Sequence, residues 1–588
     1  MEVMKRFLAG FLWPLFLSTL IWLVILEELM FYNSTACDKL NDLIFEPYKE
    51  NIHEFQVGFR SQRWDDDRIA RLLEQQIRVH CLVYLDVSDF NRGPRKLEHI
   101  RSTWGRRCNR LSTINLWEIP ITEAYRRIFR EFRHELDWLL VVYLDSFVIV
   151  ENLRYLLAPY SPNRAIYFNA QHSLFVYAHV GQIPSTDYIF SREALEQLST
   201  RNCLHDEFSL KECLGRMEHG PSDALVEFNV PDELVPFTLR QMFWLWPCAF
   251  QSVYGNQSWN SCFGRSVLFP YVTAGQMEVL EYVLYHLRPY GYVNPLLELK
   301  SLRIASRPPN NIVARHMFQS IRILCLVLTW PKEYMHGVKS ISETWGRHCN
   351  RVIYYSKSRL SGVQGAETVA LNVSDERNKL WGKTKASFRH AYEHYGHEAD
   401  WFYKADDDTY AIMENMRLML RPYSPDTPIY FGSTFNLSSE IYMSGGAGYV
   451  LSRKAVELFV NATGENSVCE PGASGTEDFE MGRCMELLKV KAGESRDLYG
   501  RHRFFSLSLQ YFLIAEDNDE FWLSLYLVHR CKKGRECCST YSISVHNVSP
   551  NEMHFLETVL YESRPYGLIA GHPPSRSSRK KRSQSGHL

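Results

Sequence analysis

The feature that most constrains this chain is an internal repeat. Four motifs of its first half return in its second half, in the same order. They are WGRRCNR from Trp104 and WGRHCNR from Trp345, EN-x-R-x-x-L-x-PYSP from Glu151 and Glu414, IYF from Ile166 and Ile429, and RPYG from Arg288 and Arg564. By subtraction the offsets are 241, 263, 263 and 276 residues, and chance matches would not keep their order at such similar offsets. The chain is therefore predicted to contain two homologous units.

The repeat organises the 588 residues into segments. We predict a cytoplasmic tail at 1–6, a transmembrane signal anchor at 7–26, a stem at 27–76, a first unit at 77–300, a linker at 301–319, a second unit at 320–570 and a basic disordered tail at 571–588. The names first unit and second unit are kept below.

Within the second unit, short apolar runs alternate with helical patterns. Residues 322–328 and 400–405 have the composition of buried strands, and the later run leads into acidic residues. Two sets of residues recur with helical spacing: Phe388, Ala391, Tyr392 and Tyr395, and then Ile412, Met416, Met419 and Leu420. This alternation predicts α/β layers around a largely parallel sheet, with the ligand site beyond the C-terminal ends of the strands.

The N-terminal run predicts a membrane anchor. Residues 7–26 carry no charge, and a helix of that length reaches about 30 Å, the thickness of a bilayer's hydrocarbon core. Lys5 and Arg6 precede the run and Glu27 and Glu28 follow it, which favours a cytoplasmic N-terminus. A cleaved signal peptide is the alternative, although its apolar core usually has about 7 to 15 residues. We expect a single-pass type II protein whose globular part lies in the secretory lumen.

A lumenal location agrees with the sequons and the cysteines. Asn-x-Ser/Thr sites occur at Asn33, Asn256, Asn372, Asn436, Asn461 and Asn547. In an oxidising lumen the 14 cysteines are expected to pair rather than to bind metal. We predict Cys81–Cys108, Cys203–Cys213 and Cys248–Cys262 in the first unit, and Cys325–Cys349, Cys469–Cys484 and Cys531 with Cys537 or Cys538 in the second, leaving over Cys37 and one member of the 537/538 pair.

Charge argues against nucleic acid as a partner. The 66 Lys and Arg residues nearly balance the 67 Asp and Glu residues, so no global basic field exists. The basic run Arg579–Arg582 is interpreted as part of a solvated tail.

Three consecutive carboxylates form the sharpest chemical feature. Asp406, Asp407 and Asp408 follow an apolar strand, where they repel one another unless a cation offsets their charge. Oxygen ligands of this kind favour Mg²⁺ or Mn²⁺, which proteins usually hold together with substrate phosphates. The triplet therefore indicates a metal-bound diphosphate, and the alternative is an Asp-rich turn or helix cap.

The motifs around the triplet narrow this choice. ADWFYKADDDTY, PIYFG, YMSGGAGYVLSR, EDFEMGRCMELL and AGESRD follow one another in the second unit. Together they resemble the β1,3-glycosyltransferases of the core 1 galactosyltransferase (T-synthase) family over residues 320–568, and the first unit resembles the family more faintly. The resemblance implies a Golgi-resident type II protein with two tandem α/β units of the nucleotide-sugar transferase kind, which is GT-A-like and Rossmann-related.

The resemblance also implies roles for particular residues. Asp406, Asp408 and His546 would hold Mn²⁺ against a UDP diphosphate, and Asp478, with Glu477 beside it, would take the proton of the acceptor hydroxyl. The implied donor-binding residues are Trp381, Lys383, Asp407, Tyr442, Ser444, Gly445 and Gly446. Structural alternatives stay open: His546 as a core residue, the Glu-Asp pair as first-turn helix acids, Trp381 as core and Lys383 as surface.

The first unit lacks much of this set. Aligned through PYSP, the triplet faces Tyr143, Leu144 and Asp145. The glycine loop faces Pro184–Asp187 and His546 faces Pro270, although Asp206 and Glu207 still face Glu477 and Asp478. We expect the first unit to be unable to hold a metal-bound nucleotide diphosphate.

Members of the resembled family pair as homodimers, so the first unit is interpreted as an inert partner in an internal pseudo-dimer. The alternative is that it extends the acceptor groove through Phe243–Trp246, where the second unit has Phe521–Ser524.

The leading hypothesis is an inverting transfer of galactose from UDP-galactose to the 3-hydroxyl of GalNAc on O-glycoproteins, which is core 1 synthesis. One alternative is a β1,3-glycosyltransferase with another donor or acceptor. The other is a non-catalytic chaperone or lectin-like relative. The intact triplet, glycine loop, Glu-Asp pair and histidine favour the enzyme, because a pure binding protein need not retain them.

Overall fold

The computed structural model describes most of both units. The described residues are 67–85, 93–171, 186–200, 214, 217–219, 267–269, 272–330, 334–358, 363, 365–437, 439–463, 467–514, 522–530, 534–562 and 564–569. The predicted spanning segment 7–26, most of the stem, the basic tail and the aromatic run at 243–246 lie outside these ranges. Within them, no helix combines the length and the apolar character needed to cross a membrane.

The first unit is built on one mixed sheet. Its strands are β1 (Val79–Leu85), β2 (Arg110–Asn115), β3 (Trp138–Tyr143), β5 (Ile166–Gln171), β6 (Thr186–Ser191) and β7 (Glu218–His219), in the order β2-β1-β3-β6-β5-β7. Its helices are α3 (Arg68–Gln76), α4 (Gly93–Ser102), α5 (Ile121–Phe132), α6 (Val150–Leu157), α7 (Arg192–Thr200) and α11 (Ala274–Glu281). Two short strands, β4 (Phe147–Val148) and β8 (Leu268–Phe269), pair separately.

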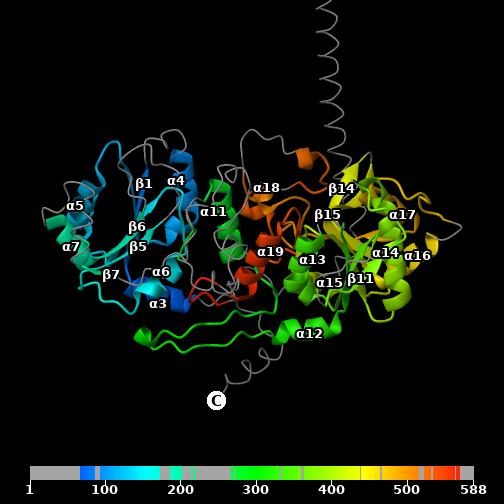
Figure 1. The fold of residues 1–588 in the computed structure, drawn as a ribbon, viewed down its shortest axis with the longest axis horizontal. Coiled ribbons are helices and arrows are strands. Elements are labelled where there is room, and N and C mark those ends of the chain that lie inside the picture. The colour runs from blue at the N-terminus through cyan, green and yellow to red at the C-terminus, as the bar shows by residue number, and fades with distance from the viewer. Residues whose placement is uncertain are drawn as a thin grey trace, which may run out of the picture. The chain divides into compact units, whose positions relative to one another are not determined.

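The second unit is built on a sheet of the same plan (Figure 1). Its strands are β9 (Ile323–Leu328), β10 (Arg351–Ser356), β11 (Thr368–Ala370), β12 (Trp401–Asp406), β14 (Ile429–Leu437), β15 (Glu440–Ser452) and β16 (Lys491–Ala492), in the order β11-β10-β9-β12-β15-β14-β16. A smaller sheet has the order β13 (Tyr410–Ala411), β18 (Ser544–Val545), β17 (Phe504–Phe505). The helices are α12 (Ile312–Ser320), α13 (Tyr334–Glu343), α14 (Leu380–Tyr395), α15 (Met413–Leu420), α16 (Arg453–Ala462), α17 (Glu477–Leu487), α18 (Leu509–Leu513) and α19 (Pro550–Glu557).

The predicted α/β class is confirmed, but each sheet is mixed. In the second unit β9, β10, β11 and β12 run parallel, whereas β15 is antiparallel to both β12 and β14. The reason is local: β14 and β15 follow each other with a short turn between them, and a short turn permits only antiparallel pairing. The first unit repeats this feature, since β6 is antiparallel to β3 and β5.

Burial explains why the predicted strands and helices form where they do. Every residue of β9 is buried, as expected for a parallel strand covered on both faces. The helical stripe predicted at 388–395 lies on α14, where Phe388 and Ala391 are buried and Tyr392 and Tyr395 pack against the same core. The stripe at 412–420 coincides with α15, all of whose side chains are buried. Both predicted helices are therefore confirmed.

Three of the predicted disulfides are present. They are Cys81–Cys108, Cys325–Cys349 and Cys469–Cys484. Cys537 is disulfide-bonded and Cys538 is a free, buried thiol, so Cys537 is the member of that pair that forms a bridge. Cys37, Cys203, Cys213, Cys248, Cys262 and Cys531 lie outside the described residues.

The C-terminal parts of the two units contact each other. Helix α11 contacts α18, and the helical turns Tyr282–His286 and Thr558–Glu562 contact one another. The Tyr282 hydroxyl lies 2.6 Å from Ser539 O and from Ser542 Oγ, and both oxygens belong to the second unit. The guanidinium of Arg564 donates in turn to the carbonyls of Val283 and Leu284. Figure 1 accordingly shows α11, α18 and α19 between the two sheets.

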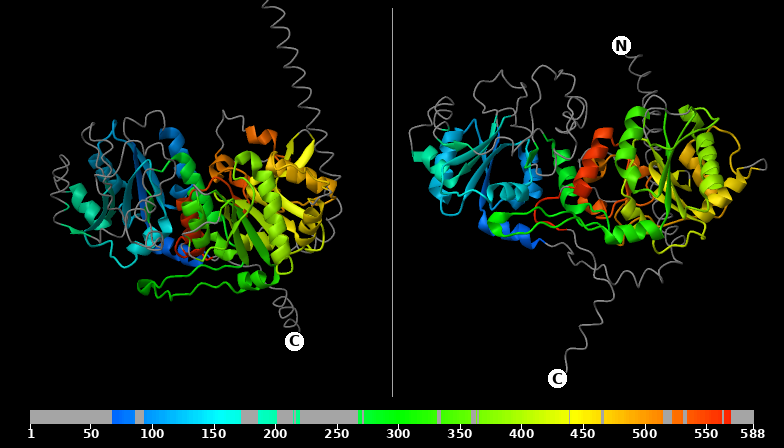
Figure 2. Two further views of the ribbon diagram at one scale, coloured as in Figure 1. Left: turned by 45° about the vertical axis from the view of Figure 1, so that its right-hand side comes forward. Right: turned by 60° about the horizontal axis from the view of Figure 1, so that its bottom comes forward.

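The stretches assigned to stem and linker contain ordered elements. Helix α3 covers residues that the sequence places at the end of the stem, and its Leu73 is completely buried. The start of the linker pairs with the end of the first unit in an extended antiparallel hairpin, bridged at Val293 with Asn310 and at Leu296 with Arg307, and this hairpin leads into α12. Figure 2 shows this green hairpin from two further sides.

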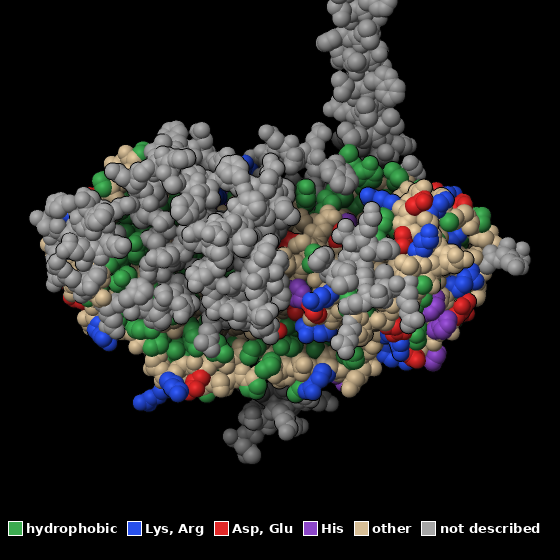
Figure 3. All heavy atoms as spheres, in the orientation of Figure 1, with side chains coloured by type: hydrophobic (Ala, Val, Ile, Leu, Met, Phe, Trp, Pro, Cys, Tyr) green, Lys and Arg blue, Asp and Glu red, His purple; other side chains and the backbone are tan. Residues whose placement is uncertain are grey.

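The described surface carries charges of both signs. In Figure 3, acidic and basic side chains are intermixed over the side where α14, α16 and α17 lie. This mixture agrees with the formal net charge of −1.

Candidate active site

The acidic triplet lies at the C-terminal end of β12, where an α/β sheet is expected to bind its ligand. Asp406 is the last residue of the strand, and a turn closed by the Thr409 N–H donating to the Asp406 carbonyl presents Asp408. Asp406, Asp408 and His546 each offer one ligand atom, and these atoms all lie within 4.8 Å of one another. The structure therefore brings together the three residues proposed as metal ligands, from β12 and from the end of β18.

The orientation of His546 is set by the backbone. Its Nδ1 lies 3.0 Å from the Ser506 carbonyl, which makes Nδ1 the donor, so Nε2 carries the lone pair in the neutral ring and a proton in the charged ring. Nε2 lies 3.3 Å from Asp408 Oδ1. Burial lowers the pKa of His546, but the hydrogen bond and charge of Asp408 outweigh burial and raise it overall. A Cβ on Gly446 would lie 2.5 Å from Nδ1, so only glycine fits beside this imidazole.

Asp407 is not part of the group formed by Asp406, Asp408 and His546. Its Oδ2 accepts a 2.6 Å hydrogen bond from the Thr329 hydroxyl at the end of β9. Burial raises the pKa of Asp407 to about 6, with Asp406 and Asp408 adding to the shift and the Thr329 hydrogen bond opposing it. Gly337 of α13 lies against it, because a Cβ there would be 3.1 Å from the Asp407 carbonyl. Asp407 thus anchors the acidic turn to the neighbouring strand end.

The Glu-Asp pair opens helix α17, and its two members have different surroundings. Glu477 is buried, and its Oε1 accepts from the Thr384 hydroxyl at 2.8 Å and the Tyr449 hydroxyl at 2.5 Å. Burial raises the pKa of Glu477. Asp478 accepts from the Gly445 N–H at 2.9 Å through Oδ2 and from the Phe479 N–H at 2.9 Å through Oδ1. The predicted glycine loop is in fact part of strand β15, and this stretch contacts both members, since a Cβ on Gly445 would be 3.1 Å from Glu477 Oε2.

Lys404 is a member of the site that sequence analysis did not identify. It lies on β12, two residues before Asp406, and its side chain is only 2% exposed. Its ammonium lies 2.7 Å from Asp406 Oδ1 and 3.6 Å from Glu477 Oε2. Burial lowers the pKa of Lys404, but Asp406 and Glu477 outweigh it and raise the pKa above its ordinary value. A lysine inside the apolar run WFYKA is the sequence signal that could have identified it.

The remaining residues of the implied donor-binding set lie on strand β15. Ser444 pairs with Ser433 of β14, and both are buried. Tyr442 packs edge-on against Phe435 and Phe479, and burial together with the charge of Asp478 raises the pKa of Tyr442 to about 12. These residues form the wall beside Asp478.

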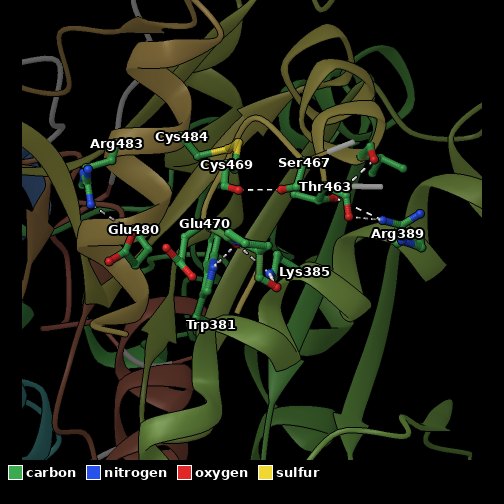
Figure 4. Close-up of a disulfide and its surroundings, with 12 residues drawn as sticks. Trp381, Lys385, Arg389, Thr463, Ser467, Cys469, Glu470, Glu480, Arg483 and Cys484 are labelled. Carbon is green, nitrogen blue, oxygen red and sulfur yellow. Dashed lines mark hydrogen bonds and ion pairs between the residues drawn. A yellow bond between two sulfur atoms is a disulfide. The ribbon is translucent and has the colours of Figure 1, made fainter. Parts of the chain in front are cut away.

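Trp381 and Lys383 belong to the interior of the unit. Trp381 is completely buried in the core with Phe459, and its indole N–H donates to the Glu470 carbonyl (Figure 4). The ammonium of Lys383 donates to the Thr329 carbonyl at 2.5 Å and to Asp375 Oδ1 at 2.6 Å, and burial lowers the pKa of Lys383. Trp381 thus occupies the core position that the sequence left open, and Lys383 is not a surface residue.

The region around Trp381 is held by a disulfide. Figure 4 shows Cys469–Cys484 joining α17 to the segment that carries Glu470, while the ammonium of Lys385 donates to the carbonyls of Glu470, Pro471 and Gly472. These contacts tie the helix that begins with Glu477 and Asp478 to α14.

The first unit has a cation where the second has its acidic cluster. Asp145 corresponds to Asp408, and the ammonium of Lys96 forms an ion pair with Asp145 Oδ1. Lys96 corresponds to Gly337, the glycine that lies against the acidic turn of the second unit. Of the three residues aligned with the triplet, only Asp145 is a carboxylate, and the ammonium of Lys96 neutralises its charge. Pro184, Asp206, Glu207 and Pro270 lie outside the described residues.

Comparisons with known proteins show what this chain is similar to. A family model described as Fringe-like matches residues 319–507. Over 270 residues the chain is 37% identical to glycoprotein-N-acetylgalactosamine 3-beta-galactosyltransferase 1 of Xenopus laevis, and the alignment covers 45% of this chain and 74% of that protein. A beta-1,3-glucosyltransferase of Mus musculus is 25% identical over 178 residues, covering 29% of this chain and 35% of that protein.

Among solved structures, a glycosyltransferase involved in the glycosylation of the major capsid of PBCV-1 aligns at a TM-score of 0.18 and 18% identity. It covers 24% of this chain and 68% of that chain.

Proposed function

Because this chain belongs to the core 1 β1,3-galactosyltransferase family, we propose that its second unit is a Mn²⁺-dependent, inverting β1,3-galactosyltransferase that uses UDP-galactose. The proposed acceptor is the 3-hydroxyl of GalNAc on O-glycoproteins. One observation carries the proposal: Asp406, Asp408 and His546 converge within 4.8 Å at the end of β12. The two units are proposed to be tandem GT-A-like domains of which only the second is catalytic.

The three converging residues fit the proposed metal. Two carboxylates and one imidazole are a donor set that suits Mn²⁺, and the Ser506 carbonyl already fixes the imidazole with Nε2 toward Asp408. When bound, the ion would offset the negative charge that develops on the UDP leaving group. The protein's own contribution is a rigid set of ligands, because Asp407 and Thr329 hold the acidic turn to β9.

Asp478 is the proposed base. In an inverting displacement a carboxylate takes the proton of the acceptor hydroxyl as that oxygen attacks the sugar from the face opposite the leaving group. The two amide donors at Gly445 and Phe479 fix the orientation of Asp478. Glu477 is enclosed by Thr384, Tyr449 and Lys404, so it supports the site from behind rather than meeting the acceptor.

The proposed cellular setting is the Golgi lumen, with a type II anchor at 7–26. The proposal rests on the uncharged N-terminal run, the sequons and family membership. The disulfides of both units suit an oxidising compartment.

The test is UDP release by the purified lumenal protein with UDP-galactose, Mn²⁺ and a GalNAc-bearing peptide. Asp408→Asn should lower turnover by at least about 100-fold, the scale of losing a metal ligand or its support. Asp145→Asn, the matched change in the first unit, should leave turnover unchanged. Equal turnover by wild type and Asp408→Asn would overturn the mechanism, and turnover with another donor sugar only would overturn the donor assignment.

A further inference from the structure

Lys404 is a buried cation in a strand that otherwise buries neutral side chains. Lysine is almost never fully buried unless it is paired, because removing its charge from water is costly. Its aliphatic stem lies across from Tyr449 of β15, with which it is in register. The question is therefore what the ammonium does in this position.

The two acids that pair with Lys404 belong to different parts of the proposed site. Asp406 is a candidate metal ligand, and only its Oδ1 is engaged by the ammonium, at 2.7 Å. Glu477 is the first residue of α17, directly before the proposed base, and its Oε2 lies 3.6 Å away. Lys404 thus lies between the ligand-bearing strand end and the base-bearing helix.

The hydrogen bonds around Glu477 extend this connection. Its other oxygen accepts from Thr384 of α14 and Tyr449 of β15. The backbone of β15 approaches Lys404 so closely that a Cβ on Gly448, whose φ is +70°, would lie 2.5 Å from the Lys404 carbonyl. A displacement of Lys404 would therefore disturb both of its ion-pair partners, Asp406 and Glu477, the first residue of α17.

The first unit supplies an internal comparison. Val141 occupies the position of Lys404, and it pairs with Tyr188 of β6 as Lys404 pairs with Tyr449 of β15. Tyr143 occupies the position of Asp406. The fold therefore does not require a lysine at this strand position, and the unit without the acid also lacks the lysine.

We propose that Lys404 is a positioning residue that holds Asp406 in its metal-binding orientation and ties it to the helix carrying Asp478. This inference rests on the proposed function of the second unit. It assigns Lys404 no direct contact with substrate. The ammonium fixes one oxygen of Asp406, and the same ammonium fixes Glu477 next to the base.

Coulomb's law and positioning predict opposite effects when the lysine is removed. Lys404 carries a positive charge next to a candidate cation ligand, so charge alone opposes the binding of Mn²⁺. Removing the charge should then strengthen Mn²⁺ binding. If Lys404 instead orients Asp406, its removal should weaken Mn²⁺ binding, although a repulsive charge has been taken away.

The experiment measures binding of Mn²⁺ alone by electron paramagnetic resonance, on the lumenal protein of both units. For Lys404→Met we expect the Mn²⁺ dissociation constant to rise about 10- to 100-fold, the usual effect of losing a group that orients a metal ligand. In the UDP-release assay kcat should fall by a similar factor, while KM for the acceptor changes less than threefold. Lys454→Met, the same change at a partly exposed lysine of α16 paired with Glu457, should match wild type in both measurements.

A double variant separates positioning from charge balance. Lys404→Met leaves Glu477 buried without its cation, and the variant can fail to fold for that reason alone. Glu477→Gln and the double variant Lys404→Met/Glu477→Gln remove that charge, so both should fold. If Lys404 only balances Glu477, the double variant binds Mn²⁺ as Glu477→Gln does, which overturns the proposal. A dissociation constant at least about 10-fold above that of Glu477→Gln supports it.

The result can be told apart from failure of the proposed function. Wild type that neither binds Mn²⁺ nor releases UDP with Mn²⁺ would overturn the function itself. Wild type that does both, with a double variant whose Mn²⁺ affinity matches Glu477→Gln or exceeds it, would overturn only the role of Lys404.

Discussion

Asn152 and Asn415 occupy equivalent positions in the two units, and each accepts a hydrogen bond from a backbone N–H of the opposite unit. The Tyr566 N–H donates to Asn152 Oδ1 at 2.9 Å, and the Tyr290 N–H donates to Asn415 Oδ1 at 2.8 Å. Both tyrosines belong to the RPYG motifs that end their units. Each unit therefore has its closing segment held by a helix of the other, α6 or α15.

The glycine that follows each of these tyrosines allows its RPYG segment to lie against a helix of the other unit. A Cβ on Gly291 would lie 2.7 Å from the Ala314 N of α12, and a Cβ on Gly567 would lie 2.7 Å from the Ala70 N of α3. Both glycines have φ near +80°, where other residues are strained. The repeated RPYG motif is thus a docking segment between units, which supports the proposed internal pseudo-dimer.

Replacing Asn415 with alanine should destabilise the lumenal protein strongly. The side chain is 1% exposed and also donates to the carbonyls of Arg288 and Ser542, so its loss leaves several buried groups unpaired. We expect the free energy of unfolding to fall by about 2 to 4 kcal/mol, measured by urea denaturation. Asn311→Ala, at a helix start where the side chain makes no capping hydrogen bond, is the control. An Asn415→Ala protein as stable as that control would contradict the role of the exchange.

The second unit expressed alone should not fold to an active enzyme. Residues 312–570 without the first unit would leave the RPYG segment at Arg564–Gly567 without α3 and α6, and would remove Tyr290 from Asn415. We expect an insoluble or inactive fragment, assayed by size-exclusion chromatography and UDP release. Co-expression with residues 62–311 as a separate chain should restore soluble protein. A monomeric fragment with full activity would show that the first unit is dispensable.

The sequence repeats and the apolar runs were enough to predict the α/β class and the placement of the strands that lead to the site. Residues 322–328 and 400–405 became β9 and β12 within one residue at each end, because a fully buried parallel strand needs an apolar run bounded by polar residues. The antiparallel direction of β15 was not predicted, because it follows from the short turn that joins β14 to β15 and not from the composition of either strand.

The contacts of the site could be predicted only in part. The acidic triplet could be recognised in the sequence because three adjacent carboxylates repel one another unless a cation offsets their charge. The hydrogen bond between Asp407 and Thr329 could not be predicted, because it depends on which strand lies beside β12. Trp381 lay in a motif of the resembled family and is nevertheless core, because an indole N–H can be satisfied by the Glu470 carbonyl in the interior. Lys404 was not predicted because its burial and its approach to Glu477 depend on the folded structure, although its other partner, Asp406, is two residues away in sequence.

Gly337→Lys should make the second unit resemble the first at the proposed metal site. In the first unit the corresponding Lys96 binds the remaining carboxylate, Asp145. A lysine beside the acidic turn should place an ammonium among Asp406 and Asp408 and raise the Mn²⁺ dissociation constant at least about 10-fold, as measured by electron paramagnetic resonance. Gly337→Ala tests the steric part alone, since its Cβ would lie 3.1 Å from the Asp407 carbonyl. Equal Mn²⁺ affinity of Gly337→Lys and wild type would count against a metal at this turn.

Acid should destabilise the first unit partly through His80. The side chain is 2% exposed, and burial, helped by the charge of Arg110, lowers the pKa of His80 to about 4. Below pH 6.5 the unfolded chain takes up this proton while the folded protein does not until about pH 4, so the stability that His80 contributes above pH 6.5 is lost as the pH falls toward 4. His80→Phe cannot bind the proton and keeps a ring against Phe132. Urea denaturation at pH 7.5 records the effect of the substitution at neutral pH, which includes loss of the 2.8 Å hydrogen bond between His80 Nε2 and Ser112 Oγ. Between pH 7.5 and 4.5 we then expect His80→Phe to lose about 2 kcal/mol less stability than wild type, and parallel pH curves would contradict this.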